Sequence, residues 1–174
     1  MKNIIVLYWN KGGNVESAAR EIQQAIGTNK VDISDIDSFD IITIQQYDLI
    51  IAGSATVGAE RWEDARNDNK WNPFFVKLSE QGIEGKNVAI FGLGDQLLYP
   101  NHFVNDMVLL KERFVELKVN VVGNWSTDGY EFNESESVID NMFCGLALDI
   151  DRQAYLNQER IFKWTQKILE ETKL

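Results

Sequence analysis

The sequence predicts an α/β fold in which amphipathic helices cover both faces of a parallel sheet. The main observation is that apolar runs of strand length alternate with stripes of helical period. The second is composition: 44% of the 174 residues are hydrophobic and 25% are charged, as in a globular protein with a sizeable core. This length suits one well-packed domain and leaves little chain for another, so we expect a single domain over residues 1–174.

The expected elements of the N-terminal half follow in regular order. A strand over residues 3–8 precedes a helix at about residues 15–26, whose apolar side chains recur on one face and which Gly27 terminates. Strands are expected next at residues 31–33 and 48–53. The run at 48–53 is almost wholly apolar, which is typical of a strand buried on both faces of a parallel sheet.

The C-terminal half continues the same pattern with one interruption. A strand is expected at residues 87–91, and two later helices carry core stripes. The stripe residues are Phe103, Met107, Leu110, Phe114 and Leu117 in one helix, and Ile161, Trp164, Ile168 and Leu169 in the other. A fifth strand begins at 119–123, and the apolar run at 143–148 looks like strand again after a polar, turn-prone stretch. We therefore expect a fifth strand interrupted by an excursion.

Charge and residue usage exclude several classes of function. The formal net charge of −10 argues against binding a nucleic acid backbone and favours partners that carry basic patches. Cys144 is the only cysteine and His102 the only histidine, so neither a disulfide nor a metal site is expected. The apolar run at 3–8 is far too short to span a bilayer, and a cytoplasmic protein without a membrane segment is expected.

Ligands of open parallel α/β sheets bind outside the carboxyl ends of the strands, so the loops that follow the strands are the candidate site. The loop after the first strand contains glycines and feeds a helix N-terminus, where free amide groups and the helix dipole favour an anion such as phosphate. It matches neither the Walker A pattern nor Gly-x-Gly-x-x-Gly, and a tight turn explains its glycines equally well. Its residues are Trp9, Asn10, Lys11, Gly12, Gly13, Asn14 and Val15.

Two further loops are expected at the same edge of the sheet. The loop after the third strand offers hydroxyl groups and flexible backbone, through Ser54, Ala55, Thr56, Val57 and Gly58. The loop after the fourth strand combines polar edges with an aromatic face, through Gly92, Leu93, Gly94, Asp95, Gln96 and Tyr99. Each could be an ordinary connection. Together they suit a ligand that has a phosphate, a linker and a planar ring.

The chain resembles a flavodoxin of the long-chain type, from the first strand to the final helix. The run Phe91-Gly92-Leu93-Gly94-Asp95-Gln96, followed by Tyr99, is similar to the flavodoxin loop that bears the flavin-stacking tyrosine. Residues 125–132 and 145–149 are similar to the family signature around the long-chain insertion. The resemblance implies a flavodoxin-like three-layer sandwich whose five-stranded parallel sheet has the order 2-1-3-4-5, with the insertion in the fifth strand. It also implies bound FMN and electron transfer between redox proteins.

The resemblance also implies roles for single residues. Tyr99 would stack on the isoalloxazine ring, and Asp95 would accept a hydrogen bond from its N3–H. The backbone near Leu93, Gly94 and Gln96 would meet the pyrimidine edge. Asp149 falls beside the site without an assigned role, and no residue is expected to act as catalytic acid, base or nucleophile because the flavin carries the redox chemistry.

The first loop departs from the family pattern, which usually reads Ser/Thr-x-Thr-Gly-x-Thr. All three hydroxyl residues are replaced, by Asn10, Gly12 and Val15. Each lost hydrogen bond to a charged acceptor is worth about 1.5–3 kcal/mol, so FMN is expected to bind more weakly or in a different arrangement. Amide donors of Asn10 and Asn14, the charge of Lys11 and the glycine amides offer compensation.

In the third-strand loop an aliphatic Val57 stands where many members have Trp, and Trp62 is expected to anchor the long 54–71 segment.

The predicted function is that of a flavodoxin, a low-potential one-electron carrier rather than an enzyme. An acidic surface opposes added negative charge on a bound group, which lowers its reduction potential. Weakly docking, basic redox proteins are the expected partners of a monomeric carrier. The alternative is a flavodoxin-fold binding or regulatory module with weakened or lost FMN binding. A phosphoacceptor regulator is less favoured because the third strand ends in Gly53-Ser54 rather than Asp. A flavin-dependent quinone reductase is also less favoured, because no residue of this chain stands out as an acid or base for a substrate.

Overall fold

The central sheet of the computed structural model, which describes residues 3–9, 11–55 and 70–174, has the strand order β2-β1-β3-β4-β5. The strands are β1 (Ile4–Trp9), β2 (Val31–Asp35), β3 (Leu49–Ala55), β4 (Asn87–Leu93) and β5 (Asn120–Val122). All four pairings between these neighbours are parallel. The predicted strand order is confirmed, with the second, third and fourth strands each two residues longer at their carboxyl ends than the sequence pattern indicated.

The fifth position of the sheet is shared by two strands, which confirms the predicted interruption. β5 pairs with the first half of β4, and β9 (Leu146–Leu148) pairs with its second half. The segment between them carries a small antiparallel sheet in the order β6-β8-β7. Its strands are β6 (Trp125–Ser126), β7 (Val138–Ile139) and β8 (Met142–Phe143). We call residues 124–145 the insertion.

The continuous strand expected at residues 143–148 is wrong in its first part. Phe143 belongs to β8 and pairs with Trp125 of the small sheet rather than with β4. The chain then crosses to the main sheet at Gly145, where a Cβ atom would lie 2.2 Å from the backbone oxygen of Ile90. Only a residue without a side chain allows this close approach, so an apolar run that reads as one strand is divided between two sheets.

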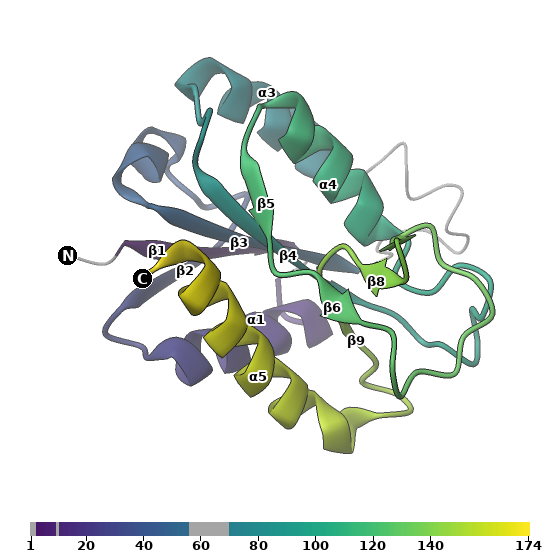
Figure 1. The fold of residues 1–174 in the computed structure, drawn as a ribbon. Helices are drawn as coiled ribbons and strands as arrows, with labels where there is room; N and C mark the ends of the chain where they lie inside the picture. Colours follow the sequence, from purple (N-terminus) through teal and green to yellow (C-terminus); the bar gives the residue numbers. More distant parts are fainter. Residues whose placement is uncertain (1–2, 10, 56–69) are drawn as a thin grey trace.

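Helices cover both faces of the sheet and complete three layers (Figure 1). On one face lie α1 (Asn14–Ile26) and α5 (Ala154–Thr172), and on the other lie α3 (Trp71–Gln81) and α4 (Asp106–Glu116). Each face has its own apolar cluster, because residues of the buried strands alternate between the two sides. α1 and α5 lie side by side, in purple and yellow in Figure 1.

Two helical segments were not expected from the sequence. A short 3-10 helix (Ile41–Gln46) begins where the Asp40 carboxylate accepts a hydrogen bond from the Ile42 amide. α3 buries a stripe at helical spacing, formed by Trp71, Phe74, Phe75 and Leu78. The polar run before Trp71 obscured this period, although the four apolar positions alone satisfy it. The predicted end of α1 is confirmed, since the Gly27 amide donates to the Gln23 carbonyl.

Candidate functional site

The carboxyl ends of β1, β3 and β4, which the three predicted loops follow, lie at one edge of the sheet. Trp9 at the end of β1 lies beside Ser54 of β3, and Ser54 lies beside Gly92 of β4. Leu93 in turn lies beside Leu148, the last residue of β9. Sequence positions from four separate strands are therefore neighbours at the carboxyl edge, where open α/β sheets bind ligands.

The loop that follows β4, residues 94–99, is held in a defined turn by Asp95; we call it the β4 loop. The Asp95 carboxylate oxygen Oδ1 accepts hydrogen bonds from the amides of Leu97 and Leu98, at 3.0 and 2.8 Å. The Tyr99 amide donates to the Asp95 carbonyl at 2.9 Å. An Asp side chain that bonds the amides two and three residues ahead organises a turn locally.

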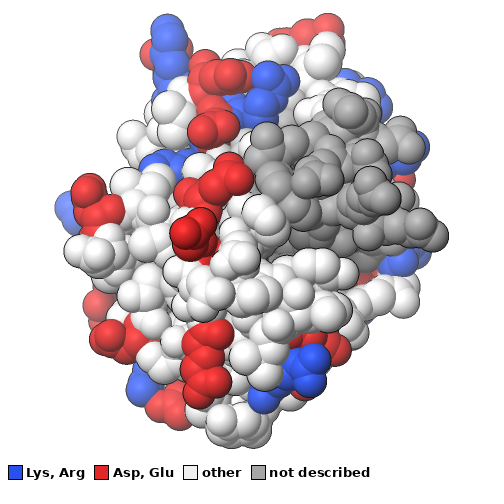
Figure 2. Space-filling view, turned by 90° about the vertical axis from the view of Figure 1, so that its right-hand side faces the viewer, with Lys and Arg blue, Asp and Glu red and all other residues white. Residues whose placement is uncertain are grey.

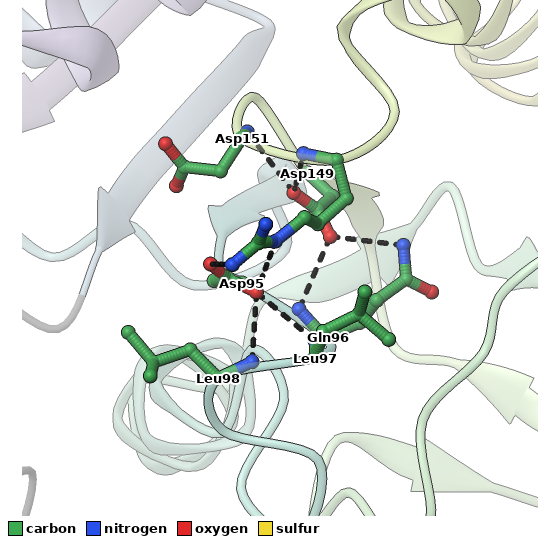
Figure 3. Close-up of polar contacts among 7 residues, drawn as sticks. Asp95, Gln96, Leu97, Leu98, Asp149 and Asp151 are labelled. Atoms are coloured by element: carbon green, nitrogen blue, oxygen red, sulfur yellow. Dashed lines mark hydrogen bonds and ion pairs between the residues drawn. The ribbon is translucent and has the colours of Figure 1, made fainter.

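Arg152, in the turn after β9, clamps the same carboxylate from outside the loop. Its Nε lies 3.2 Å from Asp95 Oδ1 and its Nη2 lies 3.2 Å from Oδ2, so the pair is bidentate (Figure 3). Burial raises the pKa of Asp95, but the Leu98 amide and the Arg152 guanidinium outweigh it and hold the pKa below its ordinary value. The Asp95 side chain is therefore ionised at neutral pH, and its oxygens act as hydrogen-bond acceptors.

A second carboxylate, Asp149, holds the β4 loop from below. The Asp149 side chain is fully buried, and its Oδ2 accepts hydrogen bonds from both the backbone amide and the side-chain Nε2 of Gln96, at 3.1 and 2.9 Å. Its Oδ1 accepts from the amides of Asp151 and Arg152, at 3.1 and 2.9 Å (Figure 3). The other end of the Gln96 side chain accepts a hydrogen bond from the Glu131 amide of the insertion.

The outer side of the β4 loop is apolar and accessible. Leu97, Leu98 and Tyr99 are 53%, 62% and 49% exposed, although each is a large hydrophobic side chain. Below them the backbone is confined: a Cβ atom on Gly92 would lie 2.3 Å from the Met107 side chain of α4. The loop thus presents an aromatic face and polar backbone on a rigid base, which suits a flat ligand with a polar edge.

The insertion braces the chain between the β4 loop and α4. The amides of Asn133 and Glu134 donate to the Pro100 carbonyl at 2.8 and 2.9 Å. The fully buried hydroxyl of Ser137 donates to the Val104 carbonyl and accepts from the Val108 amide in the first turn of α4. A serine from the insertion therefore acts as a helix cap for α4, whose own N-cap residue supplies no side-chain bond.

The loop that follows β1 spans residues 10–13, of which the structure describes 11–13; we call it the β1 loop. Gly12 has φ +81°, a left-handed conformation that favours glycine. Its amide donates to Glu16 Oε2 at 2.7 Å, and the other oxygen of Glu16 pairs with Arg20. The hydrogen bond from Gly12, together with Arg20, lowers the pKa of Glu16. Because Gly13 precedes the first residue of α1, the first amide groups of this helix point to the loop.

Among the described residues of the β1 loop, Lys11 offers a cation. The Lys11 side chain is 70% exposed, and its ammonium group lies 4.0 Å from the Asp35 carboxylate. Asn14 is exposed, whereas Val15 is buried in the apolar cluster under α1. Asn10 lies outside the described residues. The predicted anion site is thus assembled from glycine backbone, a helix N-terminus and a lysine.

Ser54 and Ala55, predicted to begin the loop after the third strand, are the last two residues of β3. Ser54 is buried and its hydroxyl donates to the Ala55 carbonyl at 3.1 Å. The predicted contributions of Thr56, Val57 and Gly58, and the anchoring role of Trp62, lie outside the described residues.

The face that carries these loops is rich in carboxylates. Figure 2 looks onto the right-hand side of Figure 1, and its centre shows more red than blue among white side chains. Exposed acidic residues of this end include Asp128, Glu131, Glu134 and Asp151. Within the described residues, no group of three or more His, Cys, Asp or Glu side chains is placed to hold a metal ion, and no helix is long and apolar enough to span a membrane.

Comparison with known proteins gives the family. The flavodoxin family model matches residues 6–164. The chain belongs to the flavodoxin family. It is 37% identical to a flavodoxin of Synechocystis sp. over 169 residues, covering 97% of this chain and 96% of that protein. It is 34% identical to flavodoxin 1 of Escherichia coli, covering 97% and 94%. The crystal structure of Fusobacterium nucleatum flavodoxin bound to flavin mononucleotide superposes with a TM-score of 0.83 at 27% identity, covering 98% and 99%.

The β4 loop of this flavodoxin follows its strand as predicted, although Gly92 and Leu93 belong to β4 itself. Three side chains that organise the β1 and β4 loops were missed. Asp149 was expected beside the site without a role, and Arg152 and Glu16 were not singled out. The signal for Asp149 was its position after the apolar run of β9, because a carboxylate at the end of a buried strand must find hydrogen-bond donors. Nothing in the local sequence indicated that those donors belong to Gln96.

Proposed function

We propose that this flavodoxin is a low-potential one-electron carrier that binds FMN non-covalently at the carboxyl edge of its sheet. The observation that carries the proposal is the β4 loop: an exposed Tyr99 stands on a turn that buried hydrogen bonds fix, beside an anion-favouring helix N-terminus. The Fusobacterium nucleatum relative, bound to flavin mononucleotide, supports FMN as the ligand.

The residues present fit the two ends of FMN. Tyr99 supplies a stacking face for the ring, and the backbone of Leu93, Gly94 and Gln96 supplies polar groups for its pyrimidine edge. Asp95 Oδ2 has Arg152 as its partner among the described contacts, which leaves a lone pair for a ring N–H. Gly92 fits as the residue that lets α4 pack close beneath the loop.

The phosphate end is assigned to the β1 loop and the loop after β3. Gly13, Asn14 and Val15 contribute backbone amides at the start of α1, and Lys11 contributes charge. Gly12, whose amide donates to Glu16, contributes the left-handed turn of the loop. Trp9, Asn10 and Ser54 flank them, with Ala55, Thr56, Val57 and Gly58 assigned to the phosphate, the linker or the second face of the ring. When bound, FMN supplies the one-electron chemistry, and the protein binds, orients and electrostatically tunes it.

The electrostatics support a low potential and transient partners. With a net charge of −10 and carboxylates on the loop face, added negative charge at the site is disfavoured. Partners are redox proteins with basic docking surfaces, steered by opposite charge. We also propose a monomeric, single-domain protein of the cytoplasm, because a large net charge opposes self-association and the single cysteine, Cys144, is buried and unpaired.

The alternative of a binding or regulatory module without tight FMN binding rests on the missing hydroxyls of the β1 loop. The family members named above and the retained β4 loop favour the carrier. FMN titration separates the two, with riboflavin as a matched ligand that lacks the phosphate.

The test begins with untagged protein. The expected result is a yellow protein that releases FMN on extraction, and an apoprotein that quenches added FMN fluorescence at micromolar concentration. The reduced protein should then pass electrons to a basic acceptor such as cytochrome c, at a rate that falls as salt screens the opposite charges. Absence of quenching at micromolar protein rejects the carrier and favours the regulatory module.

A further inference from the structure

We infer that Asp149 is the positioning residue that sets the conformation of the β4 loop, and through it the affinity and potential of the flavin ring. The inference rests on the proposed function for the identity of the ligand, FMN, but all the contacts that support it are between residues of the protein.

The hydrogen bonds of Asp149 form a complete set for a buried carboxylate. Its two oxygens accept four N–H bonds between 2.9 and 3.1 Å, two from Gln96 and one each from Asp151 and Arg152. The side chain is 0% exposed, so no water replaces a lost donor. The Asp149 side chain is therefore held in one orientation, because displacing either carboxylate oxygen would leave buried N–H donors unpaired.

The same residue ties the β4 loop to three parts of the fold. Gln96 connects Asp149 to the loop and, through its Oε1, to the Glu131 amide of the insertion. The backbone carbonyl of Asp149 accepts from the Gln153 amide and from Asn157 Nδ2 of α5. The loop conformation is therefore determined at Asp149, which follows β9 and is connected to the insertion through Gln96 and to α5 through Asn157.

The turn after Asp149 also places the Arg152 clamp. The Arg152 amide donates to Asp149 Oδ1, while its guanidinium grips the Asp95 carboxylate. Asp95 and Gln96 are adjacent in the β4 loop, so Asp149 fixes one directly and the other through Arg152. Loss of the Asp149 acceptors removes both supports of the segment that precedes Tyr99.

The charge of Asp149 has a second effect. A carboxylate that is buried beside the loop is poorly screened by solvent, so it opposes electron uptake by a group bound there. Asp151 carries the same charge two residues later on an exposed side chain, where solvent screens it. The Asp151 amide donates one of the four hydrogen bonds to the Asp149 carboxylate, but the Asp151 carboxylate takes part in none of the four. Asp151 is therefore a matched control for charge.

The test compares Asp149→Asn with Asp151→Asn. The side-chain NH₂ group that Asp149→Asn introduces would oppose the Gln96 donors, so we expect at least a 10-fold loss of affinity for FMN and an equal loss for riboflavin, since the defect concerns the ring. The midpoint potential of the bound flavin should shift in the positive direction, and more than in Asp151→Asn, whose affinities should stay within twofold of wild type. A defect that only lowered overall stability would not change the potential at temperatures well below unfolding.

Amide hydrogen exchange of the apoprotein keeps this inference separate from the proposed function. In Asp149→Asn, exchange at Gln96, Leu97 and Leu98 should accelerate at least 10-fold, while amides of α1 stay unchanged. If the exchange changes but wild-type protein binds no FMN, the proposed function fails and the positioning of the loop stands. If Asp149→Asn binds FMN and riboflavin within twofold of wild type, the inference is overturned.

A milder variant guards against failure to fold. Gln96→Met keeps the backbone bond to Asp149 and removes both side-chain bonds. We expect a smaller loss of the same kind, again equal for FMN and riboflavin. Wild-type affinity and wild-type exchange in Gln96→Met would contradict the role of the Asp149–Gln96 contact.

Discussion

The β4 loop and the β1 loop stand at the same edge of the sheet but are held in different ways. Gln96 and Asp95 of the β4 loop bond to Asp149 and Arg152, which lie beyond the loop. In the β1 loop, the Gly12 amide bonds to Glu16, one turn into the helix that follows. One loop is preorganised by a buried carboxylate and a guanidinium group from distant parts of the fold, whereas the described residues of the other contact Glu16 of α1 and, at 4.0 Å, Asp35 of β2. The ring end of the site should therefore carry most of the affinity for FMN, and the phosphate end should be open to improvement.

The largest expected effect is at the ring end. Tyr99→Ala removes the exposed aromatic face, and stacking of this kind is worth about 1–3 kcal/mol, so FMN and riboflavin should both bind about 10- to 100-fold more weakly. Titration of the apoprotein with each flavin measures this. Phe162→Ala, which removes another exposed aromatic ring from α5, is the control and should leave both affinities unchanged. A loss confined to FMN would reverse the proposed division between the loops.

A gain is expected at the phosphate end. Val15→Thr returns one hydroxyl to the first turn of α1, and a hydrogen bond to a charged acceptor contributes about 1.5–3 kcal/mol. FMN should bind about 10-fold more tightly by fluorescence titration, while riboflavin affinity stays the same. The apoprotein should lose about 1 kcal/mol of unfolding free energy, because Val15 is buried in an apolar cluster.

Val31→Thr is the matched control for this gain, since Val31 belongs to the same cluster on β2. It should show the loss of stability without any gain in affinity. Gly12 is a poor place to restore a hydroxyl, because its φ of +81° would strain a threonine. Unchanged FMN affinity in Val15→Thr would mean that the β1 loop does not hold the phosphate.

A smaller effect is expected at Lys11. An exposed ammonium group contributes below about 1 kcal/mol, so Lys11→Ala should weaken FMN binding about 2- to 5-fold at low salt and leave riboflavin binding unchanged. The difference should vanish at about 1 M salt, where screening shortens the range of the charge to about 3 Å. Lys30→Ala makes the same change in net charge after the far end of α1. An equal loss in that control would assign the effect to net charge rather than to the β1 loop.

The smallest effect is a pH dependence of stability at the β4 loop. The pKa of Asp95 is depressed in the folded protein, so its contribution to stability is present above its unfolded value of about 3.9 and is lost as the pH falls through the folded pKa. Arg152 is 47% exposed, so Arg152→Gln should cost about 0.2–1 kcal/mol at pH 7, with the difference from wild type shrinking toward pH 3. Denaturant unfolding at a series of pH values measures it, and Arg152→Lys should fall between the two. A difference that grew toward low pH would contradict the ion pair.

Period and punctuation predicted the strands of the sheet and the interrupted fifth strand, because both are local signals. The strand order came from the resemblance to the flavodoxin family that the β4 loop motif carries. The sequence did not predict that residues 143–148 divide between two sheets, since the close approach of Gly145 to Ile90 is a tertiary fact. The roles of Asp149 and Ser137 were missed for the same reason. Their side chains bond to Gln96, Val104 and Val108, and no local pattern encodes contacts at that distance along the chain.

The partners of Gln96 have a consequence for how the protein is made. Gln96 contacts Glu131, 35 residues later, and Asp149, 53 residues later. During translation the strands and helices that precede residue 96 can pair as they leave the ribosome, but the β4 loop cannot take its final shape until Asp149 has emerged. Closing loops of this length costs entropy before any contact is gained. The newly made chain should therefore pair strands β1 to β4 first, and acquire its capacity to hold a flat ligand only after β9 and Asp149 have been made.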